Sequence, residues 1–195
     1  LVWPAALRRL PAASVYALDL PGHGRSAGAG CAHIESYADG IIQFIKTLAL
    51  NNVVLMGHSM GGAIAQTIAL RHLPELSGLV LIGTGAKLRV APAILDQILL
   101  DFAQAVTTTN QFAWSASAPP KMVARGRDLL TETSPTVMHN DFTACNQFDI
   151  RTQLAQIDLP TLVIAGSADR LTPPPYGRFL ADNIPQAQFT LLDGA

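Results

Sequence analysis

A serine between two glycines stands in the sequence VVLMGHSMGGAIAQ, which covers residues 53–66. The serine is Ser59, and the glycines that frame it are Gly57 and Gly61. The apolar residues before it predict a buried strand, and the small and apolar residues after it predict a helix. The pattern G-x-S-x-G between a strand and a helix is typical of a serine nucleophile on a sharp turn. We therefore expect Ser59 to be a nucleophile, and not only a helix N-cap.

The backbone of such a turn predicts two further features. Side chains at Gly57 and Gly61 would collide across the turn, so glycine is expected at both positions. The helix after Ser59 directs free amide protons and the positive end of its dipole toward the site. The N–H group of Met60 is then suited to bind the negative oxygen that develops when a serine attacks a carbonyl group.

A serine nucleophile also needs a carboxylate and a histidine. Asp169 is the best candidate for the carboxylate because it follows the apolar run 162–165, at the carboxyl end of a predicted strand. Its expected role is to orient the histidine and to stabilise the charged form of the ring. The alternative is that Asp169 only forms the turn in GSADR.

The elements that would position these residues alternate along the chain. Helical spacing of apolar residues predicts helices over 34–48 and 64–69, and prolines bound a third between Pro173 and Pro185. The alternation predicts an α/β fold with a mostly parallel sheet flanked by helices and buried on both faces. Short apolar runs predict strands at 15–20, 53–56, 79–82, 162–165 and 188–192.

The alternation stops between residues 87 and 158. Several helical stretches follow one another there, one with apolar residues from 94 to 106 and one that begins at Ser134 and Pro135. This predicts an all-helical lid at 87–158, inserted into a core formed by 1–86 and 159–195. Alternatively, these helices simply continue the cover of the sheet.

Three segments together resemble the α/β-hydrolase superfamily. They are the elbow around Ser59, LDLPGHGRS at 18–26 after the family's fourth strand, and PTLVIAGSADRLTPP at 160–174, which resembles the seventh strand and acid loop. The resemblance covers essentially the whole chain. It implies a serine hydrolase with a helical lid that cleaves a small carboxylic ester, lactone or related acyl substrate through an acyl-enzyme on Ser59, without metal or cofactor.

The five histidines are poor candidates for the base. His58 adjoins Ser59 and is expected to point away from it, and His23 in PGHGRS resembles a family residue with a supporting role. His33 and His72 stand near helix ends, where capping or exposure is usual. His139, in the predicted lid, is the only imaginable substitute.

In the resembling family the catalytic histidine follows the last strand, whereas this chain ends FTLLDGA at Ala195. The family's first three strands and its second oxyanion donor would precede Trp3. We therefore expect an internal fragment, truncated at both ends, that is inactive alone, with the base directly after Ala195.

Composition excludes several other classes. The net charge is −1 and no basic run is present, so neither nucleic acid nor an anionic membrane is an expected partner. No metal-ligand spacing occurs. The only cysteines, Cys31 and Cys145, fit a reducing compartment and favour a cytoplasmic location over secretion. Oligomeric state is left open.

Three alternatives remain. A carbon–carbon bond hydrolase or a cofactor-free perhydrolase of the same fold would use the same residues. A non-catalytic relative could bind a ligand or partner. A dinucleotide site at Gly22, Gly24 and Ala27, after the predicted strand 15–20, is disfavoured because GAG at 28–30 interrupts the helix that must follow.

Overall fold

A four-stranded parallel sheet organises the protein, whose computed structural model describes residues 3–11 and 13–195. Each strand pairs with the next one along the chain, so that the order in the sheet is the order in the sequence. Four of the five predicted strands are therefore confirmed. They are β1 (Val53–His58), β2 (Leu76–Ile82), β3 (Thr161–Gly166) and β4 (Ala187–Leu192).

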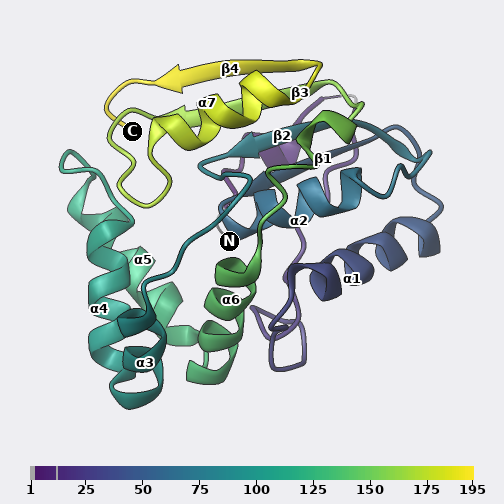
Figure 1. The fold of residues 1–195 in the computed structure, drawn as a ribbon. Coiled ribbons are helices and arrows are strands. Elements are labelled where there is room, and N and C mark those ends of the chain that lie inside the picture. Colours follow the sequence, from purple (N-terminus) through teal and green to yellow (C-terminus); the bar gives the residue numbers. More distant parts are fainter. Residues whose placement is uncertain (1–2, 12) are drawn as a thin grey trace.

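Three helices cover one face of this sheet (Figure 1). They are α1 (Ile34–Thr47), α2 (Met60–Ala69) and α7 (Pro174–Asn183), close to the predicted ranges. Helix α2 packs on β1 and β2, α7 packs on β3 and β4, and α1 packs on the outer side of α2. A short 3₁₀ helix, Leu154–Gln156, contacts α7, and a second one, Leu7–Arg9, lies in the N-terminal segment.

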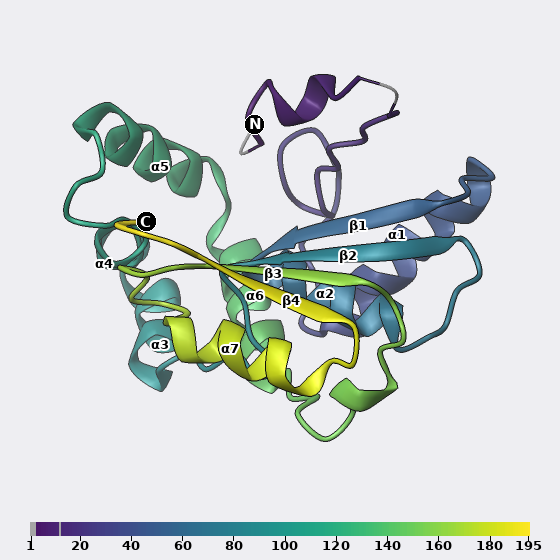
Figure 2. The ribbon, with the colours of Figure 1, turned by 90° about the horizontal axis from the view of Figure 1, so that it is seen from above.

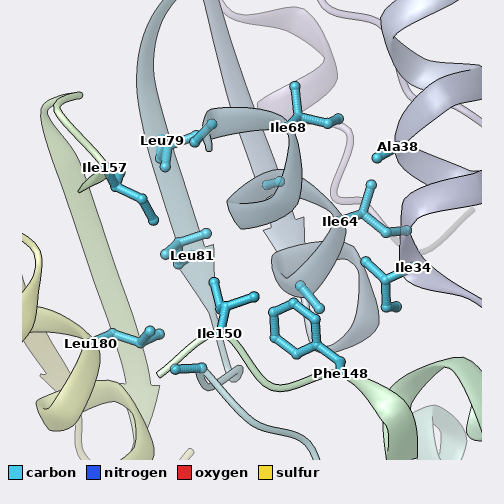
Figure 3. Packing of buried hydrophobic residues seen from close by; sticks show 14 of the residues in the cluster. Ile34, Ala38, Ile64, Ile68, Leu79, Leu81, Phe148, Ile150, Ile157 and Leu180 are labelled. Carbon is cyan, nitrogen blue, oxygen red and sulfur yellow. The ribbon is translucent and has the colours of Figure 1, made fainter. Parts of the chain in front are cut away.

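The main hydrophobic core fills the space between the sheet and these helices. Figure 3 shows Leu79 and Leu81 of β2 near Ile157 and Ile150, and Ile64 and Ile68 of α2 on the side of α1. The four side chains of β2 and α2 are at most 4% exposed. Burial of a side chain of this size stabilises the fold by about 1.5–3 kcal/mol, so these side chains hold α2 between the strands and α1.

The opposite face of the sheet is partly open in the described part of the chain. Val54 and Met56 of β1 are 56% and 38% exposed, and Leu192 of β4 is 48% exposed. The expected burial on both faces is therefore found on one face only. The covered face is the one that carries Val163 and Ala165 of β3. Helix α7 lies close to it, because a Cβ atom on Gly177 would be 3.3 Å from both side chains.

The strand predicted at 15–20 is wrong, because this segment is not paired in a sheet. Among the described residues β1 pairs with β2 alone, so the segment has no neighbouring strand with which to form a ladder. The ring of Tyr16 instead packs edge-on against Phe44 of α1, with centroids 5.5 Å apart. Figure 2 shows the N-terminal segment beyond β1, apart from the sheet.

Four helices lie between β2 and β3, where the all-helical insertion was predicted. The single stretch expected over 94–106 is divided at Asp101, whose carboxylate caps a new helix by accepting from Gln104 N–H at 3.0 Å. Ser134 caps another helix, as expected. The four are α3 (Pro92–Leu100), α4 (Phe102–Phe112), α5 (Pro120–Glu132) and α6 (Pro135–Gln147).

The insertion has a small hydrophobic cluster of its own, formed by Ile98, Ala105, Val106 and Met138. Its ends meet where Lys87 faces Asp149 in an isolated antiparallel bridge, with Nζ 2.7 Å from Oδ2. Helix α5 has no buried residue and packs on α4 (Figure 2). None of the described helices is both long and apolar enough to cross a bilayer.

Candidate active site

Ser59 occupies a strained turn between β1 and α2. Its φ is 52° and its ψ is −119°, a conformation that a non-glycine residue adopts only when the surroundings enforce it. The N–H of Ser59 donates to the carbonyl oxygen of Ile82 at 3.0 Å, which anchors the turn to β2. The predicted strand, sharp turn and helix are thus all present at the serine.

Two glycines are sterically required at this turn, and only the first of them, Gly57, is one of the two glycines that the sequence predicted. A Cβ atom on Gly57 would lie 2.1 Å from the carbonyl oxygen of Gly61. A Cβ on Gly61 would meet nothing within 4 Å, so the expected collision at that position is wrong. The second crowded position is Gly62, where a Cβ would lie 2.5 Å from Thr84.

Asp169 follows β3 and is held by three hydrogen bonds. Its Oδ1 accepts from the N–H groups of Leu171 and Thr172 at 2.9 and 2.8 Å, and its Oδ2 accepts from the Thr172 hydroxyl at 2.8 Å. These donors fix the orientation of the carboxylate at the start of the segment that leads into α7. The Asp-x-x-Thr spacing is a turn signal that could have identified Thr172 from the sequence.

Ser59 and Asp169 lie beyond the carboxyl ends of β1 and β3, and β2 lies between these two strands. Two strand spacings amount to about 10 Å, a distance that one side chain between them can bridge. Gly83 follows β2, and a Cβ there would lie 3.3 Å from both Asp169 Oδ2 and His58 Nε2. Because glycine has no side chain, position 83 leaves room for the Asp169 carboxylate and the His58 ring.

His58 is directed toward Asp169 and Gly83. The protein around the ring removes water and thereby lowers the pKa of His58, and the nearby Asp169 carboxylate opposes part of this effect. The residue is nevertheless exposed at the surface, which limits the size of the shift. With its pKa below the usual 6.5, His58 is neutral at pH 7 and does not bring a positive charge to Asp169.

The remaining histidines lie in other surroundings. His23 Nε2 lies 2.9 Å from Asp141 Oδ2, and His72 Nδ1 lies 3.6 Å from Asp158. His33 precedes α1 without a side-chain cap, and His139 is half-buried in α6.

Across residues 3–11 and 13–195, no histidine hydrogen-bonds to the Ser59 hydroxyl or to Asp169.

The glycine-rich loop 21–30 closes on itself and on its neighbours. A Cβ on Gly24 would lie 2.4 Å from Asp19 Oδ2, and the same oxygen accepts from Arg25 N–H at 3.1 Å. The strand that a dinucleotide motif requires before Gly22 is absent from this described segment. We conclude that these glycines serve the packing of the loop.

The loop of Asp169 contacts two distant parts of the chain. The N–H of Ala168 donates to the carbonyl oxygen of Ala195 at 2.7 Å, so the residues after β4 lie beside it. The guanidinium of Arg170 stacks over the ring of Phe112 at 4.4 Å, which connects the loop to the end of α4. Within the described residues, no cluster of three potential metal ligands occurs.

Comparisons with known proteins identify the family and the fold. Residues 10–195 match the family model described as serine aminopeptidase, S33. The chain is 29% identical to the pimeloyl-(acyl-carrier protein) methyl ester esterase of Neisseria meningitidis over 100% of the chain and 66% of that protein. It is 27% identical to 3-oxoadipate enol-lactonase 2 of Acinetobacter baylyi over 93% of the chain and 71% of that protein.

A solved structure of a thermophilic esterase is 34% identical and superposes with a TM-score of 0.83, over 97% of this chain and 75% of that one. The chain thus spans about two thirds to three quarters of the length of these relatives. Since the match to the family model runs through the elbow, the helical insertion and the acid loop, the chain belongs to the serine aminopeptidase S33 family of α/β hydrolases.

Proposed function

We propose that the protein is a serine hydrolase that cleaves a carboxylic ester, a lactone or a related small acyl compound. The observation that carries this proposal is the strained backbone of Ser59, with φ 52°, at the sheet edge that also carries Asp169. Strain of this kind costs on the order of 1–3 kcal/mol, and such strain clusters at active sites. A serine that only capped α2 would not need it, and its side chain accepts no capping hydrogen bond.

In the proposed reaction, Ser59 Oγ attacks the acyl carbonyl carbon while a histidine takes its proton. The carbonyl oxygen becomes negative and is bound by the N–H of Met60, the first residue of α2. The alcohol then leaves with the proton from the histidine, and the acyl group stays on Ser59. Water hydrolyses this ester by the same steps and restores the hydroxyl.

Asp169 orients the histidine in this scheme and stabilises its charged form. The bonds from Leu171 and Thr172 hold the carboxylate, so that it need not reorganise when the ring becomes charged. The base itself remains a prediction. A histidine encoded within the first codons after Ala195 would enter beside this loop, because Ala195 bonds to Ala168.

The names of two relatives support a proposal for the substrate class. One relative is named as a methyl ester esterase and another as an enol-lactonase, and both names describe cleavage of an acyl–oxygen bond. We infer the same bond type for this protein.

Covalent labelling with a fluorophosphonate probe tests the proposal in the protein as its gene encodes it. Ser59→Ala should abolish labelling, whereas Ser36→Ala, at an exposed position of α1, should label like the wild type. Labelling that persists in Ser59→Ala would refute the assignment. Turnover of p-nitrophenyl acetate by the two variants provides an independent comparison.

A further inference from the structure

Thr84 lies directly behind the nucleophile. It follows β2 by two residues, is 2% exposed and donates its hydroxyl proton to the carbonyl oxygen of Ser59 at 2.8 Å. Its side chain also occupies the space in front of Gly62, where a Cβ would lie 2.5–2.7 Å from its atoms. Thr84 therefore contacts the backbone of the turn on both sides of Met60.

The hydroxyl acts on the peptide group that joins Ser59 to Met60. In a planar trans peptide, the C=O and the N–H point in opposite directions. The oxygen of Ser59 accepts from Thr84 and from the N–H groups of Gly62 and Ala63, at 2.8, 2.9 and 3.3 Å. These donors fix the direction of the carbonyl, and with it the opposite direction of the Met60 N–H.

A second connection holds the Thr84 segment itself in place. The side chain of Gln66 in α2 is 0% exposed, and its Nε2 donates to the carbonyl oxygens of Gly62 and Gly85 at 3.0 and 3.2 Å. The residue after Thr84 is thereby tied to α2, about two turns beyond the serine. The backbone of Thr84 therefore cannot move away from Ser59 without disturbing this buried amide.

The strain at Ser59 gives this contact its importance. A residue at φ 52° relaxes toward a common backbone conformation unless its neighbours prevent it, and such relaxation would rotate the peptide that carries the Met60 N–H. Thr84 supplies the only side-chain hydrogen bond to that peptide in the described part of the chain.

We propose that Thr84 is a positioning residue, which aims the N–H of Met60 at the oxygen of the substrate through its hydrogen bond to Ser59. The inference rests on the proposed function, because it concerns the oxyanion donor of that reaction. Thr84 does not touch the substrate in this scheme. Its hydrogen bond therefore stabilises the transition state, in which the oxygen is negative, and contributes little to substrate binding.

Thr84→Val removes the hydroxyl and keeps the shape of the side chain, whereas Thr84→Ser keeps the hydroxyl. A matched control is Thr161→Val, since Thr161 is 4% exposed and donates to a carbonyl oxygen, that of Leu159, at 2.9 Å. Loss of a direct oxyanion donor costs about 10²–10³ in kcat, so misdirection of one should cost about tenfold. We expect this loss in kcat for Thr84→Val at unchanged KM, with rescue in Thr84→Ser and no loss in Thr161→Val.

The amide resonance of Met60 gives a test that needs no turnover. In ¹H–¹⁵N spectra of the 195-residue chain, Thr84→Val should shift this resonance, Thr84→Ser should restore it, and Thr161→Val should leave it unchanged. An unshifted resonance in folded Thr84→Val would overturn the inference, and so would equal kcat values for the two valine variants. If wild type and Ser59→Ala are labelled alike while the resonance shifts, the proposed function fails and the backbone role of Thr84 stands.

Discussion

The hydroxyl of Thr172 donates a hydrogen bond to Oδ2 of Asp169 over 2.8 Å, while the backbone N–H of the same threonine donates to Oδ1. One residue thus binds both oxygens of the carboxylate. This arrangement resists rotation of the Asp169 side chain, and it separates two contributions that substitution can test: the charge of Asp169 and its orientation.

Asp169→Asn should lower kcat by about 10⁴, since the amide cannot hold the histidine in the required tautomer. Thr172→Val should cost far less, about tenfold, because the backbone bonds to Oδ1 remain. Hydrolysis of p-nitrophenyl acetate by the protein as its gene encodes it measures both. Thr172→Ser is the control that keeps the hydroxyl. Equal activity of Asp169→Asn and wild type would remove Asp169 from the mechanism.

The elbow glycines should differ in their tolerance of a methyl group. Gly57→Ala places a Cβ against the backbone at 2.1 Å and should lower the free energy of unfolding by about 2–3 kcal/mol. Gly61→Ala meets open space within α2 and should raise it by about 0.5–1 kcal/mol. Urea unfolding of the 195-residue chain measures both. A large loss in Gly61→Ala would contradict the open space around position 61.

His23 should make stability fall as the pH rises. Its hydrogen bond and charge interaction with Asp141 raise the pKa above the usual 6.5, with a smaller contribution from Asp19. The protonated ring therefore stabilises the fold fully below pH 6.5, and this contribution is lost as the pH rises through the raised pKa. Urea unfolding between pH 5 and 9 should show that decline in wild type and a smaller one in His23→Gln.

His58 should act in the opposite direction. Its pKa lies below 6.5 because the folded protein removes water from the ring, so the neutral form is the stable one. Its contribution is present above pH 6.5 and is lost as the pH falls through the lowered pKa. His58→Gln should flatten the acid side of the same unfolding profile and leave the alkaline side as in wild type. A steeper acid side in the variant would contradict the sign of the shift.

Helix α5 should open more readily than the other helices. It has no buried residue, whereas eight residues of α2 are buried. Amide exchange in α5 should be at least about tenfold faster than in α2, because local opening of α5 exposes only partly buried apolar side chains such as Leu130. Hydrogen–deuterium exchange with mass spectrometry compares peptides from Pro120–Glu132 and Met60–Ala69 directly. Equal protection of the two would show that α5 is held by contacts beyond α4.

The sequence was sufficient for elements whose pattern is local. Four strands, the helix after Ser59 and the cap of α6 follow from periodicity and from Ser134. The segment 15–20 has the composition of a strand, but a strand also requires a partner, and composition does not supply one. The division of the 94–106 stretch depended on the cap at Asp101, a local signal that the apolar spacing obscured.

In the candidate site, too, the sequence predicts residues with a local signature and misses those defined by long-range contacts. Ser59 and Asp169 carry local signatures, and Thr172 could have been found from its spacing to Asp169. Thr84 could not, because its relation to Ser59 spans 25 positions and exists only once β1 and β2 pair. Gly62 was missed for a similar reason, since its neighbour is Thr84.

The bridge between Lys87 and Asp149 has a consequence for how this protein can change over evolutionary time. Because the chain leaves the core and returns to it at one point, residues can be added to or removed from the loops between α3, α4 and α5 without moving this junction. Each doubling of such a closed segment costs only about 0.6 kcal/mol in chain entropy. Changes of length in those loops are therefore tolerated at this junction, whereas α6 stays fixed to the core by Cys145 and by the contact of Asp141 with His23.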